Sequence, residues 1–405
     1  MILLENADLV LPDRILTGGW LVLDGDRIAD IGHGDRAADS GGLSFDLANH
    51  YIVPGFIDVH VHGIEGTDAL DGGAAIATMA ERLPRFGVTA FCPTSIACEP
   101  KALQTMLNGV RAARTSRPPG GARVLPAHLE SNFISAEYKG AQPVECLRGV
   151  RPGSDRGQTG VSRGTDAWTG ADILAEIAAA RPDVGIVTVA PEIDGVIDLI
   201  RDLVLHGHHV SLGHSGATYE QAMEGIRAGA RQATHLFNRM TPAAHRAPGL
   251  TGAVLESEDV VTELICDGVH VHPAMMRVAL AAKGPERIMA ITDGTAGSGL
   301  PRGSRTTLGG RAITVRDAAY LDDGTIAGSA LTMDRAFAKL TSEVGLSLSD
   351  AAMVCATTPA RALGLQGFGV IAAGAVADLV VLDRDLRVVQ TWVAGTLAWG
   401  RTAEP

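Results

Sequence analysis

The 405-residue chain has little of several features that would each point to a particular class of protein. Only 4% of its residues are aromatic, so the core must be packed mainly with Ala, Val, Leu and Ile. Lysine and arginine form no run, and the net charge is −12, which argues against a nucleic acid or an anionic membrane as partner. No uninterrupted apolar stretch is long enough to cross a membrane.

Cysteine is also scarce. The five cysteines are odd in number, widely spaced, and contain no C-x-x-C pair. This pattern favours free thiols in a reducing compartment, with Cys92 and Cys266 as small core residues of apolar runs. The first residues show no basic segment followed by an apolar one, so we expect no secretory signal and a cytoplasmic protein.

The middle of the chain alternates between strand-like and helix-like stretches. The strand-like runs cover residues 51–59, 88–95, 122–129, 184–191, 208–214, 232–237, 260–268 and 287–294. The helix-like stretches cover residues 74–87, 100–114, 171–182, 195–207, 218–230 and 273–284. About eight strands alternating with helices predict an α/β protein with a (β/α)8 TIM barrel.

The two ends of the chain are rich in β-type sequence instead. Short strand candidates broken by Gly and Asp turns fill both ends, so we predict one small β-sandwich domain built from both termini. Its predicted limits are residues 1–52 and 366–405, with the barrel over 53–365. The polar loop 142–169 is a candidate lid, and the segment 300–325 is an expected excursion at the barrel mouth.

Metal-ligand residue types close several of the strand-like runs. Active sites of (β/α)8 barrels lie at the carboxyl ends of the strands, where these side chains would meet. Imidazole and carboxylate are ligands of a borderline divalent ion, and zinc is the expected one. The candidate ligands are His60, His62, Glu130, His214 and His235.

The residues allow one ion or two. Glu130, His214 and His235 would give an ion three protein ligands and leave a position open, which is typical of a catalytic site. His60 and His62, two residues apart on a strand, could hold a second ion bridged by Glu130, or simply line the site.

Asp293 ends the last predicted strand, where it would act as general base and then general acid. Its alternative role is a turn residue in the Asp-Gly pair.

Further polar residues follow the predicted strands. Arg246 lies in a Pro- and Gly-rich loop after Asn238 and would either pair with a phosphate or carboxylate or remain a solvated surface charge. Of His270 and His272, one would line the site and the other would cap the helix beginning at Pro273.

Motifs along essentially the whole chain resemble the N-acetylglucosamine-6-phosphate deacetylase family of the amidohydrolase superfamily. The matching stretches include PGFIDVHVHG, HLE, VSLGHS-ATYEQA, ATHLFN-M, ELICDGVHVHP, DGTIAGSALTMDRAF and ATTPARALGL. The resemblance implies hydrolysis of an acetamido group on an amino sugar phosphate by a homodimer. It assigns metal binding to Glu130, His214 and His235, and acid–base catalysis to Asp293.

The resemblance also implies substrate-binding residues, namely Asn238, Arg246, His270 and the family's histidine position that is Gln142 here. In the family the arginine is often supplied by the neighbouring subunit. Several positions depart from the family pattern, and they are Ser131, Asn132, Gln142, Ala247, Gly294 and Thr295. These departures suggest that hydrolysis is retained while the sugar specificity has changed.

Alternative functions remain open at this stage. One is a deacetylase of a different N-acyl amino sugar, epimeric or without phosphate. Another is a dihydropyrimidinase-like enzyme, disfavoured because no strand end carries a candidate carboxylated lysine, or an N-acyl-amino-acid deacylase. The last, from a different class, is a non-catalytic sugar-phosphate-binding protein, which would require the loss of a ligand or base that this chain retains.

Overall fold

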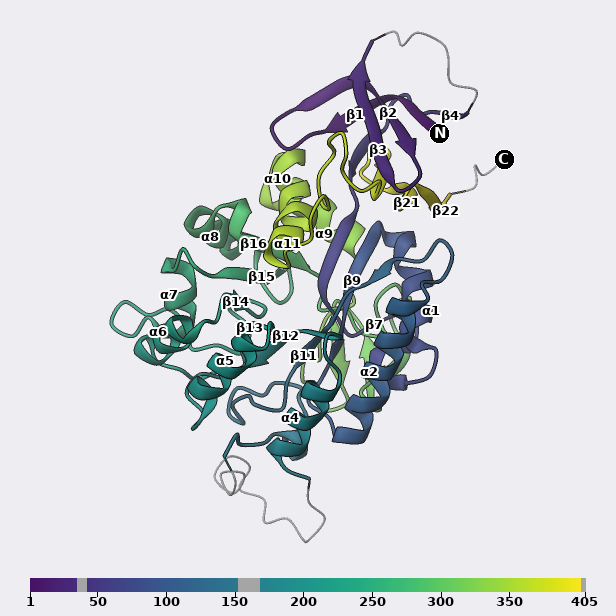
Figure 1. The fold of residues 1–405 in the computed structure, drawn as a ribbon. Helices are drawn as coiled ribbons and strands as arrows, with labels where there is room; N and C mark the ends of the chain where they lie inside the picture. The colour runs from purple at the N-terminus through teal and green to yellow at the C-terminus, as the bar shows by residue number, and fades with distance from the viewer. Residues whose placement is uncertain (35–41, 152–167, 402–405) are drawn as a thin grey trace.

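The computed structural model describes residues 1–34, 42–151 and 168–401, and its largest unit is a parallel barrel (Figure 1). The barrel strands are β6 (Phe56–Val61), β9 (Val88–Ser95), β11 (Ala127–Glu130), β12 (Val184–Val189), β13 (His209–Leu212), β14 (Gln232–Ala233), β15 (Val261–Ile265) and β16 (Ile288–Ile291). Neighbours from β6 to β16 pair in parallel, and the short β10 (Arg123–Val124) extends alongside β9.

The last strand returns to the first and nearly closes the ring. Just beyond β16, the Asp293 N–H donates to the carbonyl of His60 at 2.9 Å, and the Gly294 carbonyl accepts from the His62 N–H at 2.7 Å. The predicted (β/α)8 fold is therefore confirmed.

Helices surround the barrel, most of them between successive strands and the last of them after β16 (Figure 1). They are α1 (Ala75–Arg82), α2 (Pro100–Thr115), α4 (Gly170–Ala179), α5 (Val196–Leu205), α6 (Tyr219–Ala228), α7 (Gly249–Glu256), α8 (Pro273–Lys283), α9 (Met333–Lys339), α10 (Leu348–Ala352) and α11 (Thr358–Ala362). In α5 the buried residues Val196, Leu199, Ile200 and Leu203 recur every three or four positions, so they form one face against the strands. Among the helices of the described ranges, none combines the length and the apolar character needed to cross a membrane.

A separate sheet joins the two ends of the chain, as predicted. It contains β1 (Ile2–Val10), β2 (Ile15–Asp24), β3 (Arg27–His33), β4 (Leu43–Asp46), β5 (Tyr51–Pro54), β20 (Leu379–Leu382), β21 (Val388–Val393) and β22 (Thr396–Gly400). Phe45 of β4 contacts Trp392 of β21 with ring centroids 5.2 Å apart, so residues from the two ends of the chain pack together in this sheet. Figure 1 shows this sheet at the opposite end of the molecule from α4.

Two of the predicted strands are each divided in the structure. The run 51–59 splits at Gly55 into β5 of the small sheet and β6 of the barrel, so the prediction of one strand was wrong. A Cβ at Gly55 would lie 2.3 Å from the Thr89 hydroxyl oxygen, so the Thr89 side chain can lie this close to the backbone only at a glycine. The run 122–129 likewise divides into β10 and β11.

The predicted excursion 300–325 contains a three-stranded antiparallel sheet of β17 (Arg305–Leu308), β18 (Arg311–Val315) and β19 (Ala319–Leu321). Shorter strands β7 (Gly63–Ile64) and β8 (Thr67–Asp68) pair after β6. In the loop 142–169, residues 152–167 lie outside the described residues, so the lid stays a prediction. The domain limits 1–52, 53–365 and 366–405 also stay predictions.

Candidate active site

Most of the residues singled out in the sequence surround one cavity of about 480 Å³ at the carboxyl ends of the barrel strands. The excursion contributes to its wall through Leu308. The sequence-predicted residues that line the cavity are His62, Glu130, Gln142, His214, His235, Asn238, His270 and Asp293. His60 lies beneath them and is fully buried. Arg246 is exposed and does not line the cavity of its own chain.

The first group of possible ligands joins three strand ends. Nε2 of His214 lies 2.6 Å from Oε1 of Glu130, and Nε2 of His235 lies 2.8 Å from the same oxygen. The two imidazole Nε2 atoms are 3.0 Å apart. Nδ1 of His214 is 2.8 Å from the carbonyl of Tyr138, an acceptor that fixes the ring and leaves Nε2 free to bind a cation.

The second group lies on the other side of Glu130. Nε2 of His60 and Nε2 of His62 are 3.2 Å apart, and Oδ1 of Asp293 lies 3.2 Å from His62 and 3.4 Å from His60. Oε2 of Glu130 lies 3.6 Å from Nε2 of His62, so this carboxylate faces both groups.

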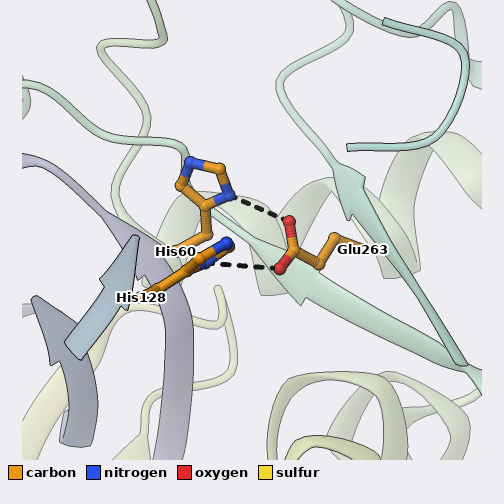
Figure 2. A group of neighbouring side chains, drawn as sticks. All are labelled: His60, His128 and Glu263. Atoms are coloured by element: carbon orange, nitrogen blue, oxygen red, sulfur yellow. Dashed lines mark hydrogen bonds and ion pairs between the residues drawn. The ribbon is translucent and has the colours of Figure 1, made fainter. Parts of the chain in front are cut away.

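A third group, made of His60, His128 and Glu263, supports the other two from inside the barrel (Figure 2). His128 and Glu263 were not predicted from the sequence. Oε2 of Glu263 accepts from Nδ1 of His60 at 2.9 Å and from the backbone N–H of His235 at 3.2 Å. Both nitrogens of His128 are occupied, Nδ1 by the Val59 carbonyl at 3.0 Å and Nε2 by the Thr188 hydroxyl at 2.8 Å. Hydrogen bonds therefore occupy both nitrogens of His128 and Oε2 of Glu263, while Oε1 of Glu263 lies 3.6 Å from Nδ1 of His128 without a hydrogen bond.

The sequence contains signals for Glu263 and His128. Glu263 is a lone carboxylate in the apolar run 260–268, and His128 precedes Glu130 by two positions, as His60 precedes His62. A charged residue is seldom fully buried unless it is paired, so such a position marks a specific interaction.

The backbone leaves regular strand geometry where the side chains converge. Positive φ angles occur at His214 (47°), His235 (32°) and Asp293 (48°), and also at Phe237 (76°) and Arg239 (52°) of the loop after β14. Such angles are uncommon outside glycine and cost free energy, which marks functional sites. They also explain why the predicted strand 232–237 ends at Ala233.

The two carboxylates that line the floor are held in the ionised form. Burial alone would raise the pKa of Glu130, but the charge and hydrogen bond of His214 and the hydrogen bond of His235 bring it well below its ordinary value. Burial also acts to raise the pKa of Asp293, and the hydrogen bond from His62 with the charge of His60 lowers it below the ordinary value. An ionised pair among imidazoles suits a divalent cation.

The remaining predicted residues are fixed by neighbours. Gln142 accepts from the Ala97 N–H at 2.8 Å and donates to Oε2 of Glu130. Nδ1 of His270 lies 2.6 Å from the carboxylate of Asp267. His272 caps α8, since its Nδ1 accepts from the Ala274 N–H at 3.1 Å, as the sequence predicted for one histidine of this pair.

Two of the departures from the family pattern point away from the cavity. The Ser131 hydroxyl donates to the Thr188 carbonyl at 2.5 Å. The Asn132 amide donates to the carbonyls of Cys98 at 2.8 Å and Cys146 at 2.7 Å. Neither side chain lines the cavity, whereas Gln142 does.

A parallel barrel with carboxylates and imidazoles converging at its strand ends defines a barrel hydrolase of the metal-dependent type. The sequence profile described as "Amidohydrolase family" matches residues 51–398. The N-acetylglucosamine-6-phosphate deacetylase of Rattus norvegicus is 36% identical over 95% of this chain and 94% of its own length. The chain belongs to the N-acetylglucosamine-6-phosphate deacetylase family of the amidohydrolase superfamily.

Two further comparisons bear on the substrate. A solved Mycobacterium smegmatis N-acetyl-D-glucosamine-6-phosphate deacetylase variant in complex with N-acetyl-D-glucosamine-6-phosphate gives a TM-score of 0.85 at 34% identity, covering 98% of this chain and 99% of that one. An N-acetylgalactosamine-6-phosphate deacetylase of Escherichia coli O157:H7 is 33% identical over 86% of this chain and 87% of its own length. The amidohydrolase family is metal-dependent.

Proposed function

We propose that this protein hydrolyses the acetamide of N-acetyl-D-glucosamine 6-phosphate to glucosamine 6-phosphate and acetate. The observation that carries the proposal is the convergence of two ionised carboxylates and several imidazoles on the floor of one cavity. Relatives of this family that match nearly the whole chain carry the same activity in their names.

The donor atoms fit a divalent ion. Zinc binds imidazole nitrogen and carboxylate oxygen at about 2.0–2.2 Å in tetrahedral geometry, so its ligand atoms lie about 3.3 Å apart. The ligand atoms of Glu130, His214 and His235 lie 2.6, 2.8 and 3.0 Å apart, which is shorter than that spacing but brings all three to one point. We propose zinc, with this group holding one ion and His60 and His62 helping to hold a second.

A bound divalent ion supplies Lewis-acid chemistry, polarising an amide carbonyl and acidifying water. The side chains of the protein transfer the proton, orient the carboxylates and bind the sugar. Asp293, 7% exposed at the cavity floor, takes the proton of the attacking water and returns it to the leaving nitrogen. The contact with His62 orients the Asp293 carboxylate, and Gln142 holds Glu130 through Oε2 of its carboxylate. Asn238 and His270 in the cavity wall bind the sugar.

The proposed assembly is a homodimer in the cytoplasm. Arg246 is exposed outside the cavity of its own chain, which supports a role in the cavity of a neighbouring subunit. The five cysteines are all buried and free, which supports a reducing compartment.

A second candidate is deacetylation of another N-acetyl amino sugar. Gln142 occupies a cavity-wall position where the family resemblance expects histidine, and Gln cannot carry charge toward a phosphate. The relative named for N-acetylgalactosamine 6-phosphate supports an epimeric substrate in particular.

Acetate release tests both candidates. We expect release from N-acetylglucosamine 6-phosphate that stops after chelation and returns with Zn²⁺. Because a general acid–base group contributes about 10²–10⁴-fold, Asp293→Asn should lower kcat by that factor, while the exposed control Asp385→Asn should leave it unchanged.

The same assay should include N-acetylgalactosamine 6-phosphate and unphosphorylated N-acetylglucosamine. A clear preference for either would replace the first candidate by the second. Binding without any acetate release would identify a sugar-phosphate-binding protein instead of an enzyme.

A further inference from the structure

Arg239 is a cation in the cavity wall that none of the roles above uses. It follows β14 four residues after His235 and lines the same cavity as His214 and Asp293. It occupies the gap in the motif ATHLFN-M, so the family resemblance gave it no role. Within the described ranges, no ion pair or hydrogen bond engages its guanidinium.

The position of Arg239 is fixed by its backbone. Its φ is 52°, a strained value for a residue with a side chain, and its carbonyl accepts from the Ser215 N–H at 3.0 Å. Ser215 follows His214 directly, so Arg239 is tied to the end of β13 that supplies a candidate metal ligand. The same kind of strained angle occurs at His214, His235 and Asp293.

The absence of a side chain at Gly140 leaves room for the arginine side chain. A Cβ at Gly140 would lie 2.9 Å from Nε of Arg239, and Gly140 itself has a φ of 59°. Both residues line the cavity, so the arginine side chain lies against Gly140 in the cavity wall.

Arg239 is a positive charge in a cavity with several carboxylates. The chain carries a net charge of −12, and the cavity is lined by the carboxylates of Glu130, Glu137 and Asp293. The proposed metal ions would offset the charge of Glu130 and Asp293, and a cation in the cavity wall would attract an anionic substrate to this acidic chain. His62, His214 and His235 are candidate metal ligands, and His270 already contacts Asp267 at 2.6 Å. Among the described residues, none occupies the guanidinium donors of Arg239.

We propose that Arg239 binds the phosphate of the substrate from within the same subunit and thereby sets the specificity for phosphorylated amino sugars. The inference rests on the proposed function for the identity of the sugar. A guanidinium presents two parallel N–H donors that match two phosphate oxygens, which a lysine ammonium cannot do. Each cavity would then hold its own phosphate-binding cation, whatever Arg246 adds from outside.

The test compares kcat/KM for N-acetylglucosamine 6-phosphate and for unphosphorylated N-acetylglucosamine. Because a hydrogen bond to a charged group contributes enough to change binding by about 10- to 100-fold, Arg239→Ala should lower kcat/KM for the phosphorylated sugar by that factor, mainly through KM. The unphosphorylated sugar should be unaffected. Arg239→Lys should restore part of the loss, and Arg277→Ala, an exposed arginine of α8, should change neither.

Equal losses for both sugars, or no loss for the phosphorylated one, would overturn the role of Arg239 while leaving the proposed function intact. Calorimetry of glucosamine 6-phosphate and of glucosamine binding to the zinc-loaded protein tests the role of Arg239 independently of acetate release. If the wild type releases no acetate but prefers the phosphorylated ligand, and Arg239→Ala abolishes that preference, the inference stands and the proposed function fails. A wild type without a preference for phosphate in either experiment overturns the inference.

Discussion

At the scale of single residues, one buried carboxylate orients parts of both ligand groups. Glu263 accepts from Nδ1 of His60 and from the backbone N–H of His235 through the same oxygen (Figure 2). The bond to His60 fixes its tautomer with the lone pair on Nε2, the atom that faces His62. Supporting carboxylates of this kind raise the basicity of ligating imidazoles.

We therefore expect Glu263→Gln to weaken metal binding by about 10- to 100-fold, because a neutral amide is a poorer acceptor for these two donors. Competition with a chromogenic chelator measures the affinity, and the thermal midpoint of the metal-free protein checks that the variant folds. The control is Glu286→Gln, whose side chain lies outside the cavity. A folded Glu263→Gln protein with wild-type affinity would show that His60 needs no such partner.

The sequence predicts the candidate ligands at strand ends better than the residues that hydrogen-bond to them. The pair His60 and His62 is visible because its spacing matches one face of a strand. Glu263 is visible only as a lone carboxylate in an apolar run, and its role is hidden because its partners His60 and His235 come from distant parts of the chain. The consequence of Asn132 was equally hidden, because its acceptors, the carbonyls of Cys98 and Cys146, are brought together only by the fold.

At the scale of elements, a buried lysine links α8 to the end of α7. Nζ of Lys283, at the end of α8, donates to the Val254 carbonyl at 3.0 Å and to the Ser257 carbonyl, just after α7. Cations stabilise the carbonyl end of a helix. Burial, followed by the charge of Arg287, lowers the pKa of Lys283 to about 8.

This pKa predicts how stability changes with pH. Between about pH 8 and 10.5 the unfolded chain still binds the Lys283 proton while the folded chain has released it, so the free energy of unfolding should rise with pH. Urea unfolding at several pH values measures the free energy of unfolding of the wild type and of Lys283→Met. The wild-type value minus the variant value should rise across this window. Lys101→Met, on the exposed surface of α2, is the control. A difference independent of pH would mean that Lys283 titrates normally.

Elements with a clear period were predicted closely, and the failures have physical causes. The helix predicted at 218–230 is α6, which begins with Thr218 and Gln221 capping each other. α7 was missed, because Gly249, Leu250, Thr251, Ala253 and Val254 are all buried and leave no amphipathic stripe. The division at Gly55 was missed because both halves of the run 51–59 are apolar and only the tertiary fold assigns them to different sheets.

At the scale of the whole molecule, the small sheet has a core of its own but shares its other face with the barrel. The shared core includes Val10, Val53, Val380, Leu382 and Val388 from the small sheet. Asp378, at 3% exposure, joins the two parts, because its carboxylate pairs with Arg123 of β10 at 3.1 Å and accepts from the Ala394 N–H at 2.6 Å.

This shared interior predicts that the protein unfolds in one transition. Three of the four tryptophans, Trp20, Trp392 and Trp399, lie in the small sheet, whereas the helices belong to the barrel, so fluorescence and far-ultraviolet circular dichroism report on different parts. We expect both signals to change at the same urea concentration. Asp378→Ala should lower the free energy of unfolding by about 2–3 kcal/mol, since it leaves Arg123 and the Ala394 N–H without their acceptor. The exposed control Asp385→Ala should have little effect. Fluorescence that changes at a lower urea concentration than the circular dichroism in the wild type would mean that the small sheet unfolds independently, and the predicted limits at residues 52 and 366 would then mark a separately stable domain.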